Sequence, residues 1–148
     1  MKNIIEIERI PYEEPYHLEL MFKASTEEHA GQLRIYTKTE SLKECAQNLI
    51  VFPRHSSDSV LWELGSERPE DRFGFYFRFR AFLQKSTGES FIQIRLNNNE
   101  ATPGTAISEF HISTKAESVQ ILGGLIREFS ELESSKLFWN GVDGQVIK

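Results

Sequence analysis

The sequence predicts an α+β fold: an antiparallel sheet of about six strands, in the order β-β-α-β-β-β-β-α, with two helices packed on one face. Three observations lead to this prediction. Six segments alternate apolar and polar residues, two segments carry apolar residues at helical spacing, and the connections are polar. In the clearest strand, residues 73–83, one face is almost all Phe and the other carries Tyr, Arg and Phe. Such alternation is typical of an antiparallel sheet with one face in the core and the other in water.

The remaining predicted strands alternate in the same way and are bounded by turn residues. They are residues 17–24, 32–38, 60–64, 90–96 and 108–112. Residues 1–14 predict an N-terminal arm or edge strand, and residues 134–148 a C-terminal tail that forms a short strand or stays loose. The 148 residues show no internal repeat, so residues 1–148 are expected to form a single domain.

Each predicted helix follows a capping-box pattern, in which a hydroxyl and a carboxylate three residues apart satisfy the first free amides. The first helix would begin at Ser41, with Thr39 an equally good cap, and run to about Ile50. The second would begin after Thr114 and carry an apolar stripe to Leu132. Gly123 and its neighbour lie inside that stripe, which indicates close approach of the helix to the Phe-lined sheet.

Both helices would cover the Phe-rich face and leave the opposite face open. The aromatic and cationic residues expected there are the candidate partner-binding residues: Tyr36, Tyr76, Arg78, Arg80, Phe82, Phe91 and Arg95. One interpretation is a solvated face with cross-strand ion pairs, which contribute about 0.2–1 kcal/mol each. The other is a protein-docking surface, because Tyr, Phe and Arg are enriched in interfaces.

Two histidine–carboxylate pairs are candidate metal ligands. His17 and Glu19 share one face of a strand, and so do Glu109 and His111. If the two strands were neighbours, the four side chains could meet a transition metal. The sequence does not give the strand order, so we predict no metal and no cofactor. The single cysteine, Cys45, lies on the apolar stripe of the first helix, where a thiol is typically an inert small hydrophobe.

Composition disfavours several classes of function. The formal net charge is −5, whereas a protein that neutralises phosphates needs the opposite balance, so nucleic-acid binding is not expected. The N-terminus carries acidic residues where a signal peptide has an apolar run, and no apolar stretch is long enough to cross a bilayer. These observations favour a protein without a membrane partner that is cytoplasmic, or is exported by a route that leaves no sequence signal.

The order of these signals from His17 to Leu132 resembles a family of small uncharacterised bacterial domains. The matching segments are Leu18-Glu-Leu20, Gly31, Tyr36, Leu49-Ile-Val-Phe-Pro53, Trp62-Glu-Leu-Gly-Ser66 and the capped helix from Thr114. The first turn, Ser25–Gly31, lacks the Asn-Gly usual in that pattern. Domains of this size and layout resemble immunity proteins of bacterial toxin systems. The resemblance implies a partner that is a toxin, and no catalytic residues in this chain.

The leading hypothesis is therefore a non-catalytic protein-binding module, in its finer form an immunity-like inhibitor that docks through the open face. The alternative is a small ligand-binding protein or metal-dependent enzyme with its site on the sheet face or the long loops. A third hypothesis is that the open face is buried in a homodimer.

Overall fold

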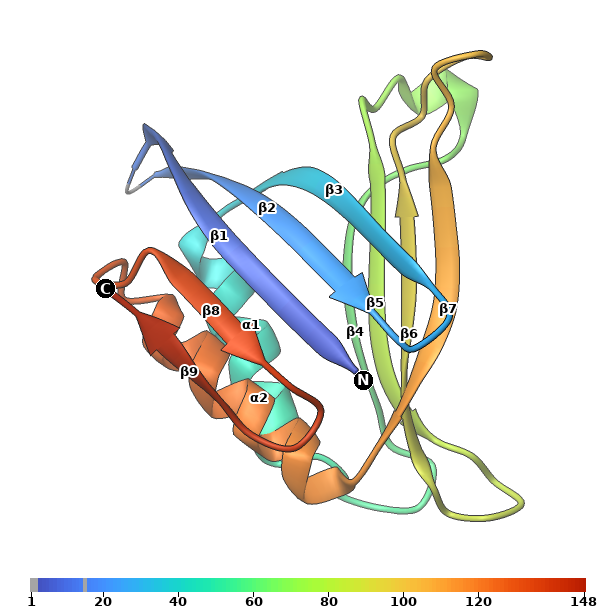
Figure 1. Cartoon of the computed structure of the whole chain (residues 1–148), viewed down its shortest axis with the longest axis vertical. Helices are drawn as coiled ribbons and strands as arrows, with labels where there is room; N and C mark the ends of the chain where they lie inside the picture. The colour runs from blue at the N-terminus through green and yellow to red at the C-terminus, as the bar shows by residue number, and fades with distance from the viewer. Residues whose placement is uncertain (1–2, 15) are drawn as a thin grey trace.

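The computed structural model describes residues 3–14 and 16–148 and confirms the α+β class (Figure 1). Its elements in chain order are β1 (Ile4–Glu13), β2 (His17–Ser25), β3 (Ala30–Thr37), α1 (Thr39–Ile50), β4 (Ser59–Gly65), a 3₁₀ turn η1 (Pro69–Asp71), β5 (Tyr76–Leu83), β6 (Ser90–Asn97), β7 (Ile107–Thr114), α2 (Ala116–Phe129), β8 (Lys136–Trp139) and β9 (Gly144–Ile147).

The strands divide between two antiparallel sheets, where the sequence predicted one. The five-stranded sheet has the order β3-β2-β1-β8-β9, and the four-stranded sheet has the order β4-β5-β6-β7. Alternation shows which side chains a strand buries, but it does not show which strands pair. Two amphipathic sheets that face each other bury their apolar sides, and so does one continuous sheet covered by helices. The two arrangements therefore fit the same alternation.

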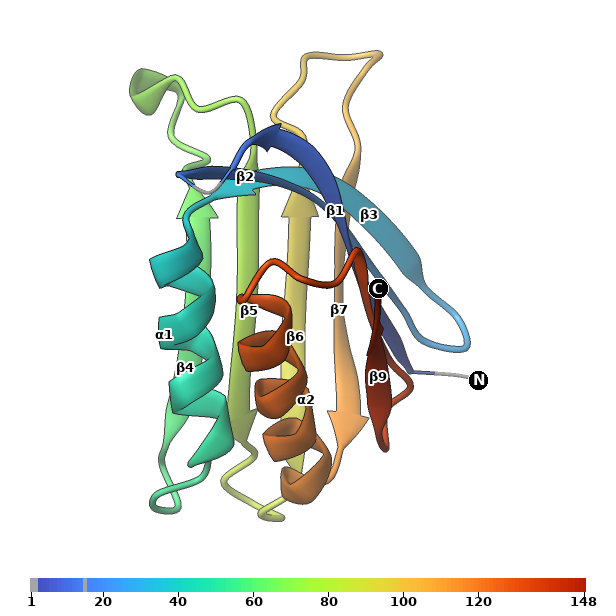
Figure 2. The ribbon, with the colours of Figure 1, turned by 90° about the vertical axis from the view of Figure 1, so that its left-hand side faces the viewer.

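The core lies between the two sheets and the helices. Figure 2 shows α1 and α2 side by side on one face of the four-stranded sheet, as the sequence predicted, with the five-stranded sheet covering the rest of that side. Phe22 of β2 meets Phe77 of β5 edge-on, with ring centroids 4.9 Å apart, and Trp62 of β4 at 6.5 Å. The outer face of the four-stranded sheet is thus covered by none of the described elements.

Both chain ends contribute to the five-stranded sheet. Residues 4–13, expected as an arm or edge strand, form its central strand, paired with β2 on one side and β8 on the other. Residues 1 and 2 lie outside the described residues. The C-terminal tail supplies β8 and β9, and Leu137 and Trp139 are fully buried. The pairing of β1 with β8 joins segments about 130 residues apart, so no local pattern reveals it.

The helices form where predicted, but neither begins with its predicted capping box. Helix α1 begins after Lys38 and α2 after Lys115, and neither of these positions makes a side-chain capping bond. The Ser41 hydroxyl instead accepts a hydrogen bond from the Trp62 indole at 3.1 Å, and the Thr114 hydroxyl donates to the Gly141 carbonyl at 2.9 Å. Tertiary partners therefore take the hydroxyls that the local pattern assigned to capping.

Two further details differ from the sequence predictions. The Phe-rich strand begins at Tyr76, so Phe73 lies in the preceding loop and is 52% exposed. Gly123 allows close approach of α2 to the other helix, α1, and not to the sheet. A Cβ atom at Gly123 would lie 2.8 Å from the backbone nitrogen of Ile50 and 2.8 Å from Cβ of Leu49, both in α1.

Candidate functional site

Six of the seven predicted partner-binding residues lie on the outer face of the four-stranded sheet. They are Tyr76, Arg78, Arg80 and Phe82 on β5, and Phe91 and Arg95 on β6. The alternation of β5 and β6 places them there, because the intervening residues point into the core. The seventh, Tyr36, lies on β3 in the other sheet, where its ring centroid is 6.2 Å from that of Phe75.

One half of this face is a polar network, in which acids and cations compensate one another. Its members are Glu63, Glu67, Tyr76, Arg78, Gln93, Arg95, Asn97 and Glu109. Arg95 lies at the centre, with nitrogen atoms 2.7 Å from Glu67 and 2.7 Å from Glu109. Arg78 donates to Gln93 at 3.2 Å and lies 3.5 Å from Glu63.

The network shifts the pKa values of its members. Hydrogen bonds from Gln93 and then Arg95 lower the pKa of Glu109. Burial, with the hydrogen bond to Glu63, raises the pKa of Tyr76. Each shift favours the protonation state that these groups already have near neutral pH. The shifts therefore keep Glu109 charged and Tyr76 neutral.

The other half of the face is an aromatic patch, formed by Leu61, Arg80, Phe82, Phe91 and His111. The rings of Phe82 and Phe91 are stacked, with centroids 6.0 Å apart, and His111 meets both edge-on at 5.9 and 6.5 Å. The guanidinium carbon of Arg80 lies 4.5 Å from the Phe82 ring centroid. Leu61 is opposite Arg80 in register and is 49% exposed.

Arg80 differs from the other two arginines on this face. Arg78 and Arg95 each lie within ion-pair distance of a glutamate, whereas among the described residues no carboxylate lies within ion-pair distance of Arg80. The stacking contact orients its guanidinium without neutralising it. The aromatic patch therefore carries an oriented and uncompensated positive charge.

The four candidate metal ligands do not meet. His17 and Glu19 lie on β2 in the five-stranded sheet, whereas Glu109 and His111 lie on β7 in the four-stranded sheet. Glu19 pairs with Arg34 at 2.6 Å, and Glu109 belongs to the polar network. Within residues 3–14 and 16–148, no group of three or more His, Cys, Asp or Glu side chains is arranged to hold a metal ion.

Sequence reasoning missed four residues of this face: Leu61, Glu63, Glu67 and Asn97, the last of which it read as the start of a loop. Leu61 and Glu63 alternate with the buried Val60 and Trp62, so the pattern of that strand contained the signal for them. Glu67 lies in a loop with no periodic signal. It reaches the face only because Arg95 and Asn97 both bind its carboxylate at 2.7 Å.

The chain matches no protein-family model, and the search of curated proteins finds no match. Among solved structures, one chain of the CdiA-CT/CdiI toxin and immunity complex from Enterobacter cloacae aligns with a TM-score of 0.47 and 13% sequence identity. The alignment covers 86% of this chain and 99% of that chain. A similarity at this level supports no inference about function.

Two loops extend past one end of the four-stranded sheet and are tied together (Figure 1). They are residues 66–75, between β4 and β5, and residues 98–106, between β6 and β7. The side-chain amide of Asn99 donates to the carbonyl oxygens of Ser66 at 2.8 Å and Phe73 at 3.1 Å. Asn99 has a φ of 54°, a conformation that Asn tolerates better than most residues. These bonds hold the loops as one extension of the sheet.

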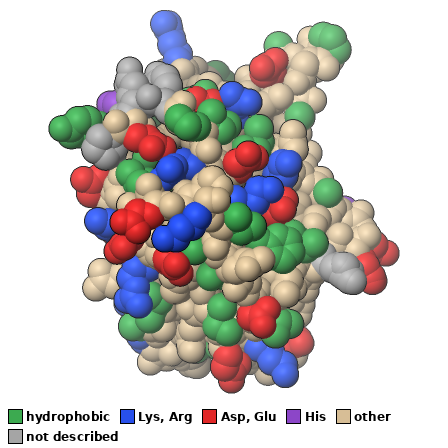
Figure 3. Space-filling view, turned by 60° about the vertical axis from the view of Figure 1, so that its left-hand side comes forward, with side chains coloured by type: hydrophobic (Ala, Val, Ile, Leu, Met, Phe, Trp, Pro, Cys, Tyr) green, Lys and Arg blue, Asp and Glu red, His purple; other side chains and the backbone are tan. Residues whose placement is uncertain are grey.

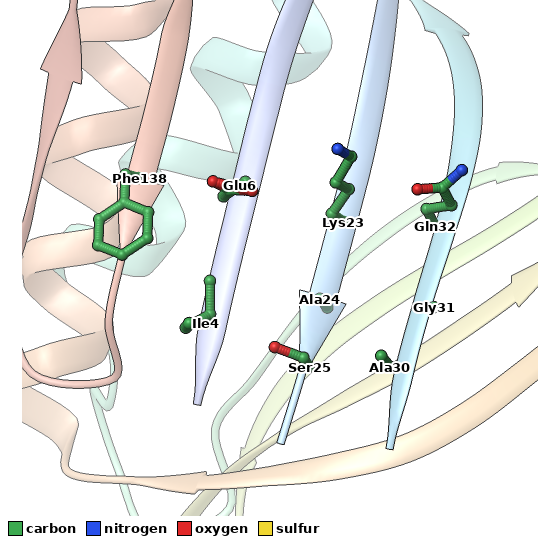
Figure 4. A pocket seen from close by; sticks show the side chains of 9 residues that line it. All are labelled: Ile4, Glu6, Lys23, Ala24, Ser25, Ala30, Gly31, Gln32 and Phe138. Atoms are coloured by element: carbon green, nitrogen blue, oxygen red, sulfur yellow. The ribbon is translucent and has the colours of Figure 1, made fainter. Parts of the chain in front are cut away.

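The five-stranded sheet has a different outer surface. Figure 3, an oblique view of that sheet and the helices, shows Lys and Arg side chains interspersed with Asp and Glu. A shallow depression of about 440 Å³ lies over β1, β2 and β3, where Glu6, Lys23 and Gln32 project from the sheet beside Phe138 (Figure 4). One anion, Glu6, and one cation, Lys23, line this depression, so it has no excess of either sign.

A larger depression, of about 570 Å³, lies between β3 and the tied loops. Its walls include Arg34, Tyr36, Phe75 and Asn98. This is the place where the alternative hypothesis expects a ligand, between a sheet and the long loops.

Cys45 is buried in α1, and burial raises the pKa of its thiol far above the ordinary value, which leaves the thiol protonated and unreactive. In the described part of the chain, neither helix has the length and apolar character needed to cross a membrane.

Proposed function

We propose that this chain is a non-catalytic protein-binding module that docks a partner protein through the outer face of the four-stranded sheet. The observation that carries the proposal is the aromatic patch, in which Phe82, Phe91 and an uncompensated Arg80 lie together on a face that no described element covers. Arginine and aromatic side chains dominate the hot spots of protein interfaces. Phe82 and Phe91 are partly exposed and lie beside the exposed Leu61, and a contiguous apolar cluster on an uncovered face marks a candidate interaction site.

The size of the face is consistent with this role. Its strands have seven or eight residues. At a rise of ~3.4 Å per residue and a strand spacing of ~4.8 Å, the face measures about 19 by 27 Å. That is a flat area of about 500 Å², and a standard interface buries about 800 Å² of accessible surface per partner. The tied loops at its end would supply the remainder.

The finer proposal is that the partner is a toxin and that docking blocks it. It is supported by the resemblance of the sequence layout to immunity proteins. A sheet face can inhibit in this way without chemistry of its own, because a docked protein excludes substrate from the surface it covers.

The test compares two double variants that make the same chemical change on different sheets. Arg80→Glu with Phe82→Ser alters the outer face of β5, and Lys23→Glu with Met21→Ser alters the outer face of β2. We expect the β5 variant to lose the partner captured from the native host and the β2 variant to keep it. The captured protein, expressed alone, should arrest growth, and co-expression of the wild-type chain should relieve the arrest.

Recovery of the same partner by the β5 variant, with unchanged circular dichroism, would overturn docking through this face. A captured partner without toxicity would leave docking intact and remove only the inhibitor role.

One observation favours the alternative, a small ligand-binding protein: the depression beside Arg34, Tyr36 and Phe75 has the volume of a small-molecule site. A thermal-shift screen with anionic metabolites checks it. A ligand that raises Tm for the wild type and not for Arg34→Gln would favour this function, and elemental analysis of the purified protein would reveal a bound metal.

A further inference from the structure

The charges on the outer face of the four-stranded sheet are unequally compensated, and this inequality identifies the chemistry of a partner. Arg78 and Arg95 have glutamate partners within the chain, but Arg80 has none among the described residues. Arg80 is also partly buried, with its guanidinium against the Phe82 ring. A cation held in place against an aromatic ring has already lost part of its hydration and side-chain freedom, so a carboxylate that pairs with it does so at a reduced cost.

We propose that the partner segment seated on the aromatic patch presents a carboxylate side chain to Arg80, flanked by apolar side chains that pack on Phe82, Phe91 and Leu61. This inference rests on the proposed docking function and adds the chemistry of the partner. The guanidinium supplies a planar fork of donors that suits a carboxylate. The stacked rings of Phe82 and Phe91 supply the apolar contact beside it.

A nucleic acid fits this surface less well than an acidic protein segment. A phosphate backbone requires a track of cations, whereas Arg80 is the one arginine on the face that lacks a carboxylate partner among the described residues. Glu63, Glu67 and Glu109 lie on the same face and would repel phosphates. The net charge of −5 also repels phosphates, and it does so over a longer range.

A second copy of this chain also fits less well. In a symmetric dimer the same patch would contact itself, which would bring the two Arg80 guanidiniums toward one another without a carboxylate between them. Like charges opposed across an interface cost free energy unless an acid intervenes. The polar network could supply an acid only by giving up its own pairs.

The test selects peptides from a displayed random library on the immobilised full-length chain. We expect the enriched peptides to share an Asp or Glu next to an aromatic or aliphatic residue. Synthetic versions of them should bind the Arg80→Gln variant at least about tenfold more weakly than the wild type. Their binding to Lys23→Gln, which removes an exposed cation from the outer face of the other sheet, should change by less than about threefold.

Two further readouts separate a charge-paired contact from a merely structural effect. Arg80→Lys keeps the charge without the planar fork and should recover part of the affinity lost in Arg80→Gln. Added salt should weaken binding to the wild type more than binding to Arg80→Gln. Because Arg80 makes no ion pair within the described residues and loses only its contact with the Phe82 ring, we expect the Tm of each Arg80 variant to stay within a few degrees of the wild type.

The outcomes distinguish failure of this inference from failure of the docking function. Peptides that Phe82→Ser no longer binds, but that lack a carboxylate or tolerate Arg80→Gln, would overturn the carboxylate inference and leave docking in place. If no selected peptide depends on Phe82, the docking function itself fails. Arg80-dependent binding of an oligouridine RNA, or an Arg80-dependent dimer in light scattering, would replace the acidic protein partner with a nucleic acid or a second copy of the chain.

Discussion

Asp58 is the most strongly constrained acid in the described structure. It lies in the connection between α1 and β4, and its side chain is 4% exposed, whereas that of Arg54 is 49% exposed. One carboxylate oxygen accepts from the backbone N–H of Arg54 at 2.8 Å and from Nε at 3.0 Å, and the other accepts from the second guanidinium nitrogen at 2.9 Å. The hydrogen bonds from Arg54 lower the pKa of Asp58 to about 2, although burial opposes the shift. The carboxylate therefore closes a short loop that has no regular structure of its own.

The shift makes the free energy of unfolding depend on pH. A carboxyl with a depressed folded-state pKa stabilises the protein above its unfolded pKa of about 3.9, and this contribution is lost as pH falls toward the folded value of about 2. We expect Asp58→Asn to cost about 1–2 kcal/mol at pH 7, measured by urea denaturation. The difference from the wild type should fall below half of that value at pH 2.

Glu89→Gln is the control for Asp58, because Glu89 is exposed and makes no ion pair in the described residues. Its effect should be small at every pH. A difference between the wild type and Asp58→Asn that stays constant from pH 7 to pH 2 would show that the carboxylate does not act through its charge.

At the scale of elements, the missing side chain of a glycine lets the two helices pack closely together. Gly123 lies where α2 crosses α1, and a Cβ atom there would be 3.1 Å from the Ala46 carbonyl as well as 2.8 Å from Leu49 Cβ. The adjacent Gly124 faces open space, with no atom within 4 Å of its would-be Cβ. Of these two neighbouring glycines, only Gly123 lies where the packing leaves no room for a side chain.

This difference makes a matched pair of variants. Gly123→Ala should destabilise the protein by about 1–3 kcal/mol, because the added methyl group would push the helices apart. Gly124→Ala should stabilise it by up to about 1 kcal/mol through helix propensity alone. Chemical denaturation measures both. Equal effects of the two substitutions would mean that α2 does not approach α1 through Gly123.

The position of the helix pair also determines which surface remains open. Helices α1 and α2 cover the inner face of the four-stranded sheet together with the five-stranded sheet (Figure 2), so the aromatic patch is left on the outside. The indole of Trp139 on β8 donates to the Ser118 carbonyl in α2 at 3.0 Å, which fixes the C-terminal strands to the same helix. The tail that the sequence left undecided is thereby part of the core.

At the scale of the whole molecule, the two sheets meet where β3 crosses β7. A Cβ atom on Gly31 would lie 2.6 Å from both Cβ and Oγ of Ser108, and 3.2 Å from a methyl group of Leu96. Small side chains on both strands therefore set the distance between the sheets.

A double-mutant cycle tests this contact. Gly31→Ala should cost about 1–3 kcal/mol, because the added methyl group meets Ser108. Ser108→Gly alone should cost less than about 1 kcal/mol. The double variant should lose about 1 kcal/mol less free energy of unfolding than the two single variants lose in sum. Removing the Ser108 side chain makes room for the methyl group added at position 31. Additive costs in urea denaturation would show that these strands do not touch.

Local periodicity predicted the strands β2 to β7, the two helices and most of the candidate face. The alternation around Phe77 and Phe79 gave the strand, its buried face and its exposed arginines, because a pleated strand fixes the direction of each side chain. Six of the seven candidate partner-binding residues were placed on one face by that rule alone. The helices followed from apolar residues at helical spacing, although the hydroxyls of Ser41 and Thr114 serve tertiary partners instead of the predicted caps.

The tertiary structure decided everything that depends on which strands are neighbours. Tyr36, His17 and Glu19 lie in the five-stranded sheet, whereas Glu109 and His111 lie in the four-stranded sheet. Residues 4–13 form a central strand because they pair on both sides. The tertiary structure also decided that Arg78 and Arg95 have glutamate partners, because Glu63, Glu67 and Glu109 reach the face from other strands and a loop, while Arg80 has no such partner among the described residues. The physical reason is that side-chain direction is a property of one strand, whereas ion pairing and sheet membership are properties of the distances between strands.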